Sequence, residues 1–188
     1  MKRLDEMKWE CFTIKELFGN DGIEHCKCSN VSKLSDGNIP YVGATIANNG
    51  IMRFLLPYAN LITKGNCIAF ICDGDGSIGL SIYKEHDFIG STTVKVGRAP
   101  WVNKYTGMFF TTIADLGRAR YSFGYKRNDR NLLREHIMLP VSARHKPDYA
   151  YMENYMRDKE RHALENYKIY LEKQIRSSKP CDCLSSKG

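Results

Sequence analysis

The sequence predicts an α+β protein, in which a strand-rich domain is followed by one long C-terminal helix. Short apolar segments separated by Asn-Gly and Asp-Gly turns occupy much of residues 1–142, a pattern typical of hairpins. Residues 149–175 contain no Gly or Pro and consist mainly of strong helix formers. With 43% hydrophobic and 26% charged residues, the 188-residue chain has an ordinary globular composition. We therefore expect a domain over 1–142, a long helix over 143–176 and a flexible tail over 177–188.

The first half of the domain is predicted to form a strand, a helical turn and two hairpins. Residues 9–18 mix strand and helix spacing, which fits a short strand running into a helical turn. Residues 39–55 alternate apolar and small side chains around Asn48-Asn49-Gly50, which supply the φ > 0 positions of a tight turn. A second hairpin is expected over residues 66–83, where two apolar segments flank a Gly-rich turn.

The second half of the domain is predicted to contain a strand, a helix and a closing strand. Residues 88–96 have the composition of one strand, and residues 105–114 indicate an amphipathic helix or a buried segment. The basic and aromatic segment 118–134 interrupts this pattern. Residues 137–140 then form an apolar strand that ends at a proline. The long helix should begin at Pro147-Asp148.

The long helix carries apolar side chains at spacings of three and four, and charged residues occupy its other faces. This spacing predicts a seam that pairs with another helix as a coiled coil. The expected partner-helix residues are Met152, Tyr155, Met156, Ala163, Tyr167 and Tyr170.

Composition limits the possible classes of protein. No apolar run is long enough to cross a bilayer, and the first residues lack the apolar stretch of a secretion signal, so we expect a cytoplasmic protein. Seven cysteines, several in apolar stretches, are expected to be free thiols. A net charge of +7 permits binding to a polyanion, although a solvated basic surface explains it equally well.

The basic segment between residues 118 and 134 is the strongest candidate for contact with DNA. Arg and Asn side chains match the edges of guanine and adenine, while Lys and Arg neutralise phosphates. A solvated basic turn is the competing interpretation of the same residues. The candidates are Arg118, Arg120, Tyr125, Lys126, Arg127, Asn128, Arg130, Asn131 and Arg134.

A second candidate contact is the tip of the first expected hairpin. Asn48 and Arg53 could enter a groove of DNA as a β-ribbon does, whereas Asn49 is better explained by the backbone of the turn.

Metal binding is a minor alternative. The turn Asp73-Gly74-Asp75-Gly76-Ser77 is similar to the start of a calcium loop but lacks its later ligands, which favours a hairpin turn. The pairs Cys26/Cys28 and Cys181/Cys183 have one intervening residue, fewer than the two to four usual for structural zinc. We therefore predict neither a metal site nor a cofactor.

Catalytic residues are not evident in the sequence. The five histidines are scattered, and the chain lacks a phosphate-binding Gly-rich loop and the Asn-Pro-Pro-Tyr type motif of a base methylase. Two alternatives to a non-catalytic DNA reader stay open. One is a protein-interaction module. The other is a small magnesium-dependent nuclease that would use the dense acidic group Asp73, Asp75, Glu85 and Asp87.

Several short motifs occur in an order that resembles one family over most of the chain. They resemble the target recognition domain of type I restriction-modification specificity subunits, particularly short subunits that accompany fused methylase-nuclease chains. The motifs are Trp9-x-x-Phe12, Asn38-Ile39-Pro40-Tyr41-Val42-Gly43-Ala44, Asn48-Asn49-Gly50, Ile62-Thr63-Lys64-Gly65-Asn66, Cys72-Asp73-Gly74, Gly90-Ser91-Thr92, Asn103-Lys104-Tyr105 and residues 121–127.

The resemblance implies a non-catalytic protein that binds double-stranded DNA and directs methyltransferase and restriction subunits, or a fused methylase-nuclease, to a target site. Members usually carry two recognition domains separated by two long helices, which act as a ruler and as the docking surface for the methyltransferase. This chain has one domain and one helix. The resemblance therefore implies a half subunit that pairs with a second copy, or a subunit whose second half is lost. The base-reading loops vary between members, so the family does not assign them here.

Overall fold

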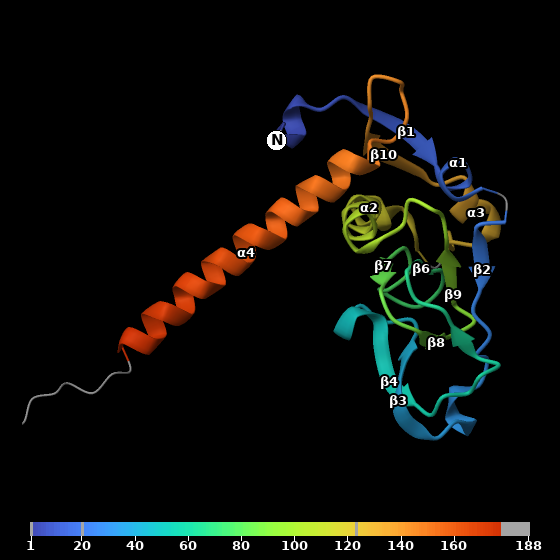
Figure 1. Ribbon diagram of the computed structural model, residues 1–188. Coiled ribbons are helices and arrows are strands. Elements are labelled where there is room, and N and C mark those ends of the chain that lie inside the picture. Colours follow the sequence, from blue (N-terminus) through green and yellow to red (C-terminus); the bar gives the residue numbers. More distant parts are fainter. Residues whose placement is uncertain (1, 20, 123, 178–188) are drawn as a thin grey trace, which may run out of the picture.

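The computed structural model describes residues 2–19, 21–122 and 124–177, and it confirms an α+β fold with a long C-terminal helix (Figure 1). Ten strands of the described chain form three sheets. The first sheet pairs β1 (Trp9–Thr13) with β10 (His136–Pro140). The second has the order β2 (Ile23–His25), β9 (Val94–Gly97), β6 (Cys67–Ile71) and β7 (Ser81–Lys84). The third has the order β4 (Ile51–Leu55), β3 (Asp36–Val42), β8 (Phe88–Gly90) and β5 (Ile62–Thr63).

Helices connect and cover these sheets. The α-helices are α1 (Ile14–Phe18), α2 (Lys104–Leu116), α3 (Asp129–Leu133) and α4 (Tyr149–Ser177). Short 3-10 helices are η1 (Leu4–Glu6), η2 (Val31–Lys33), η3 (Asn48–Gly50) and η4 (Arg118–Arg120). None of the described helices is long and apolar enough to span a membrane.

The chain enters the fold as predicted, with a strand that runs into a helical turn. The Thr13 hydroxyl accepts a hydrogen bond from the Glu16 amide at 3.2 Å, and the Glu16 carboxylate accepts one from the Thr13 amide at 2.6 Å. This reciprocal pair is a capping box, which starts α1 directly after β1. Because β1 pairs antiparallel with β10, the beginning and the end of the domain lie side by side.

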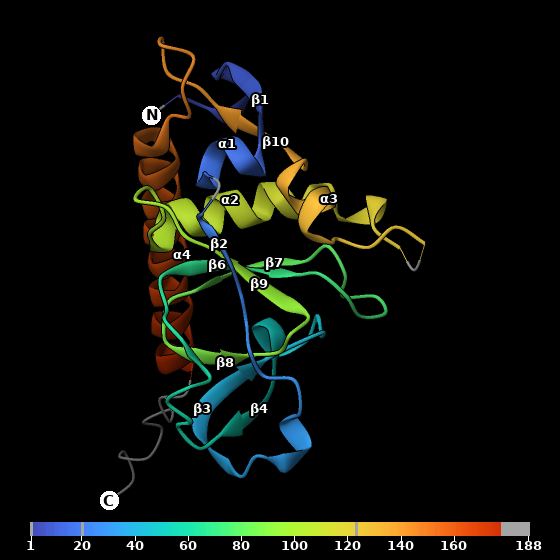
Figure 2. The same ribbon diagram turned by 90° about the vertical axis from the view of Figure 1, so that its right-hand side faces the viewer.

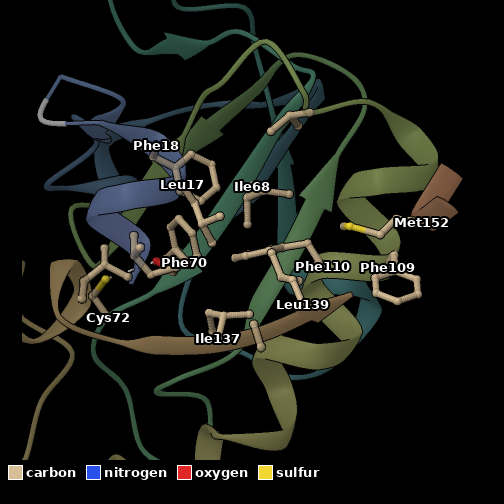
Figure 3. Close-up of a cluster of buried hydrophobic side chains, with 14 residues drawn as sticks. Leu17, Phe18, Ile68, Phe70, Cys72, Phe109, Phe110, Ile137, Leu139 and Met152 are labelled. Atoms are coloured by element: carbon tan, nitrogen blue, oxygen red, sulfur yellow. Dashed lines mark hydrogen bonds between the residues drawn. The ribbon is translucent and has the colours of Figure 1, made fainter. Parts of the chain in front are cut away.

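The main core lies between the second sheet, α1 and α2 (Figure 3). Phe18, Phe70 and Phe110 meet edge to face, with ring centroids 5.7 to 6.4 Å apart. Such aromatic pairs add stability beyond the area that they bury. All five residues of β6 are buried, which explains its continuous apolar sequence.

Both predicted hairpins are confirmed. Strands β3 and β4 are antiparallel, as are β6 and β7. Asn48, Asn49 and Gly50 have φ values of 48°, 54° and 77°, so the Asn-Asn-Gly sequence supplies the left-handed backbone that its turn requires.

The single strand predicted over residues 88–96 is wrong. Residues 88–90 form β8 in the third sheet, and residues 94–97 form β9 in the second. A turn between them is closed by the Val94 amide, which donates to the Ser91 carbonyl at 2.9 Å. The segment therefore passes from one sheet to the other, and every residue of both short strands is buried.

The long helix is confirmed, but part of its predicted seam faces its own domain. Met152 is fully buried in the main core, so the prediction that it contacts a partner helix is wrong. Tyr155 and Met156 also pack against this core. By contrast, every residue from 161 to 175 is exposed, including Ala163, Tyr167 and Tyr170. The predicted flexible tail lies outside the described residues, apart from Ser177 at the helix end.

Candidate nucleic-acid interface

Three loops meet at one edge of the domain, and we call residues 43–50, 73–77, 118–122 and 124–126 the loop edge. The Arg118 guanidinium donates to the Gly76 carbonyl at 2.9 Å, and the Lys126 ammonium pairs with the Asp73 carboxylate at 2.7 Å. Gly74 lies so close to Ala44 that a Cβ at position 74 would overlap it. In Figure 2, the tip of the β6–β7 hairpin and the segment after α2 lie on the opposite side of the domain from α4.

The β6–β7 hairpin tip is the part of this edge that sequence reasoning did not select. Gly74 and Gly76 have φ values of 115° and 68°, which confirms a turn and explains both glycines. The hydrogen bond from Lys126 holds the pKa of the Asp73 carboxyl below its usual range. An open cavity of ≈ 750 Å³ lies between the tip and the basic segment, lined by Asp73, Asp75, Ile78, Arg118, Tyr121 and Ser122.

Arg127 corrects the sequence-based prediction, because its side chain is fully buried and cannot contact DNA. It donates to the Glu135 carboxylate at 2.8 Å and to the Gly79 carbonyl at 3.0 Å. Its guanidinium also lies 4.8 Å from the centroid of the Phe70 ring. The Tyr121 hydroxyl donates to the same Glu135 oxygen at 2.9 Å, and burial raises the pKa of Tyr121. Arg127 therefore fixes the basic segment to the β6–β7 hairpin.

The two asparagines of the basic segment have local structural roles. The Asn128 side chain accepts a hydrogen bond from the Asn131 amide at 2.9 Å and caps α3. The Asn131 side chain donates to the Lys126 carbonyl at 2.7 Å. These bonds shape the segment that carries the charges, and the predicted contacts of Asn128 and Asn131 with bases stay a prediction.

The remaining cations of the segment face solvent. Arg120, Lys126, Arg130 and Arg134 are exposed, and Arg118 is half-buried. Tyr125 is exposed and stacks on the buried Tyr121, with ring centroids 5.9 Å apart. In the basic segment, one arginine is therefore buried, whereas five cations and one tyrosine could contact a polyanion.

The two hairpin candidates differ in their surroundings. Asn48 is exposed within the loop edge. Arg53 lies on β4 and forms an ion pair with Asp36 across the β3–β4 hairpin. The Asp36 carboxylate therefore already binds the Arg53 guanidinium, whereas the exposed Asn48 could contact DNA.

The structure also bears on metals and cysteines. In the described ranges, no three His, Cys, Asp or Glu side chains are grouped to hold a metal ion. Of the acidic group considered for magnesium, Asp73 pairs with Lys126 and Asp87 pairs with Lys64. Burial raises the pKa of the Cys26 and Cys28 thiols, while Cys181 and Cys183 lie outside the described residues. Cys11, Cys26, Cys28, Cys67 and Cys72 are free thiols.

A domain of small sheets with clustered loops, exposed cations at one edge and a projecting helix has the features of a nucleic-acid recognition module. Residues 6–171 match the family described as the type I restriction modification DNA specificity domain, and the chain belongs to this family.

The chain is similar to proteins of restriction-modification systems. It is 30% identical over 159 residues to the specificity subunit S.BcgI of a type II restriction enzyme from Heyndrickxia coagulans, which covers 83% of this chain and 45% of that protein. The fold resembles the S subunit of a type I restriction-modification system from M. genitalium, with a TM-score of 0.56 and 17% identity. A structure of a type I restriction-modification assembly gives a TM-score of 0.52 and 12% identity. Each structural match covers 90% of this chain and 43% of the other chain, so this chain spans less than half the length of these relatives.

Proposed function

We propose that this chain is a non-catalytic, sequence-specific DNA-binding module that directs methyltransferase and endonuclease subunits of a restriction-modification system to their target. Membership of the DNA specificity domain family is the observation that carries this proposal. The loop edge supports it physically, because Arg118 lines an open cavity there and the exposed Arg120 and Lys126 belong to the same loop. Base modification and strand cleavage would be performed by the partner subunits in the cytoplasm.

The loop edge and the residues that follow it, 129–134, would contact the DNA with a division of roles. Arg120, Lys126, Arg130 and Arg134 would neutralise phosphates, since all four are exposed. Asn48 and Arg118 would approach base edges with the hairpin tip. Asp75 adds an acceptor at this tip, and carboxylates can accept hydrogen bonds from the amino group of cytosine.

The exposed half of α4 would pair with the same helix of a second copy, which would bring a second recognition domain. Leu164, Tyr167, Tyr170 and Leu171 are large hydrophobic side chains at least two-fifths exposed, at spacings that fit a helix–helix seam. A second copy of this chain would place two domains on DNA in opposite orientations. The methyltransferase subunit would dock on the same helices, as the resemblance implies.

Selection from random duplex DNA at two salt concentrations tests the proposal. The purified chain should enrich a motif of a few defined bases, repeated in inverted orientation if two copies pair, and binding should weaken as salt rises. Selection with the methyltransferase present covers the case in which the partner is required. Failure to retain any duplex at low salt in either format would overturn the proposal and favour a protein-interaction module.

A further inference from the structure

We propose that a polar brace between α2 and α4 sets the angle at which the long helix leaves the domain, and thereby the spacing between two recognised half sites. The brace consists of Asn103, Lys104 and Tyr105 at the start of α2 and of Glu153, Arg157 and Glu160 on α4. The effect on spacing rests on the proposed function, whereas the effect on the helix angle does not.

The apolar contact between α4 and the domain is confined to the first turns of the helix. Tyr149 stacks on Trp101, with ring centroids 4.8 Å apart and an interplanar angle of 6°. Met152 is buried in the core beside Phe109 and Phe110 (Figure 3), and Tyr155 meets Phe109 edge to face. Residues 149–156 span only about 10 Å along the axis. An anchor this short holds the helix in place but controls its direction weakly.

The brace extends this contact along the helix. The Asn103 amide donates to the Glu153 carboxylate at 2.9 Å. About two turns further on, the Glu160 carboxylate accepts hydrogen bonds from the Lys104 ammonium at 2.5 Å and from the Tyr105 hydroxyl at 2.8 Å.

Arg157 joins the two ends of the brace. Its guanidinium donates to Glu153 at 2.9 Å and lies 4.1 Å from the centroid of the Tyr105 ring. Every member therefore touches another, and two separate points of α4 are tied to the N-terminus of α2.

The charges of the brace support its geometry. The hydrogen bond from Lys104 lowers the pKa of Glu160, and the bond from Arg157 lowers the pKa of Glu153. Both carboxylates are therefore ionised at neutral pH. Single exposed ion pairs contribute little to stability, so this network is better suited to fix a direction than to hold the fold together.

The exposed part of α4 converts small angular changes into large displacements. Residues 161–175 are exposed on all sides, and the helix continues for about 26 Å beyond Glu160. A rotation of about 10° would move its end by roughly 4–5 Å, which exceeds the rise of about 3.4 Å per base pair. Loss of the brace should therefore change the spacer by one base pair or more.

The test compares the double variant Glu153→Ala/Glu160→Ala with the control Asp158→Ala/Glu172→Ala. Both remove two negative charges from α4, but Asp158 pairs with Arg161 and His162 on α4 itself. Spin labels are introduced at the exposed positions Lys33 and Lys168 as unnatural amino acids, so that the native thiols are not modified. Distances are measured by electron–electron resonance after dilution with excess unlabelled protein, and circular dichroism verifies that each variant folds.

We expect the distance distribution of the brace variant to broaden by several ångströms, and that of the control to match the wild type. In selections from random DNA, the brace variant should keep the same half-site bases but accept neighbouring spacer lengths. An unchanged distance distribution would overturn the brace. A broadened distribution with one strict spacer length would overturn its role in spacing. If the wild type selects a single, unsplit motif, the role in spacing is overturned, and if it retains no duplex, the proposed function fails. In both cases the distances still decide whether the brace directs the helix.

Discussion

Arg127 shows, for a single residue, that the location of a side chain in the fold decides whether it can contact DNA, and that its charge alone does not. Its sequence neighbours Lys126 and Asn128 are exposed, yet Arg127 is fully buried between Glu135, Gly79 and the Phe70 ring. A basic run alone cannot reveal this, because the partner carboxylate is separated in sequence and β6 lies far away along the chain. The nearest sequence signal is Glu135, an acidic residue between the apolar Leu133 and Ile137.

Replacement of Arg127 by alanine should destabilise the fold strongly. It would leave the Glu135 carboxylate buried without its cation, which costs about 3–5 kcal/mol. Urea denaturation should show this loss as a lower midpoint. The control Arg130→Ala removes an exposed arginine of the same segment and should change stability by less than about 0.5 kcal/mol while weakening DNA binding. Equal stability of the two variants would contradict the buried role of Arg127.

Asp129 predicts a pH dependence of stability. Its carboxylate pairs with the ammonium of the nearly buried Lys95 at 2.7 Å, and this bond lowers the pKa of Asp129. A lowered folded-state pKa gives stability that is present above the unfolded value, near 3.9, and is lost as the pH falls through the folded value. The Asp129→Asn variant should therefore be less stable than the wild type at pH 7.

The same comparison at low pH tests the cause of that difference. In urea midpoints measured from pH 7 down to pH 3, the gap between Asp129→Asn and the wild type should narrow below about pH 4. Asp21→Asn, at an exposed position, should follow the wild type throughout. A gap that stays constant with pH would mean that the asparagine disturbs packing rather than an ion pair.

At the scale of elements, local patterns predicted most of the structure. The two hairpins, the strand and turn at residues 9–18 and the long helix follow from spacing, turn residues and helix propensity. The break between β8 and β9 could not be predicted, because residues 88–96 are strand-like throughout and only tertiary packing divides them. The sequence could not show which part of the α4 seam faces the domain. Met152 and Tyr167 belong to the same periodic pattern, but the domain covers only Met152.

The exposed seam of α4 predicts self-association that can be removed without harm to the domain. The variant Leu164→Ser/Tyr167→Ser should shift the chain toward monomer in sedimentation equilibrium, because it removes two exposed apolar side chains from the proposed contact. Its thermal unfolding should keep the domain's wild-type midpoint at low protein concentration. Lys168→Ser, next to the seam, is the control. A wild type that is monomeric at all concentrations would assign the seam to another partner.

At the scale of the whole molecule, two loops of the loop edge, the β6–β7 tip and the segment after α2, lie on the side of the domain opposite α4 (Figure 2). This separation allows DNA and a protein partner to be bound at the same time. Sequence could locate the basic segment and the Asn-Asn-Gly tip, but it could not show that the β6–β7 tip lies between them. The sequence of the β6–β7 turn is fully explained by the backbone conformation that the turn requires. The contacts that join this turn to Arg118 and Lys126 connect residues that are far apart in the sequence.

The position of the charges, rather than their number, should determine DNA affinity. The variant Arg120→Ala/Lys126→Ala/Arg130→Ala should bind duplex DNA more weakly and should lower the slope of log affinity against log salt by about three, or about one per lost phosphate contact. Lys15→Ala/Lys33→Ala/Lys168→Ala removes the same charge from exposed sites away from the loop edge. Fluorescence anisotropy over a salt series would measure both slopes. If the two variants lose affinity equally, net charge alone explains binding and the basic segment is not the interface. A loss confined to the first variant would place the DNA against the basic segment.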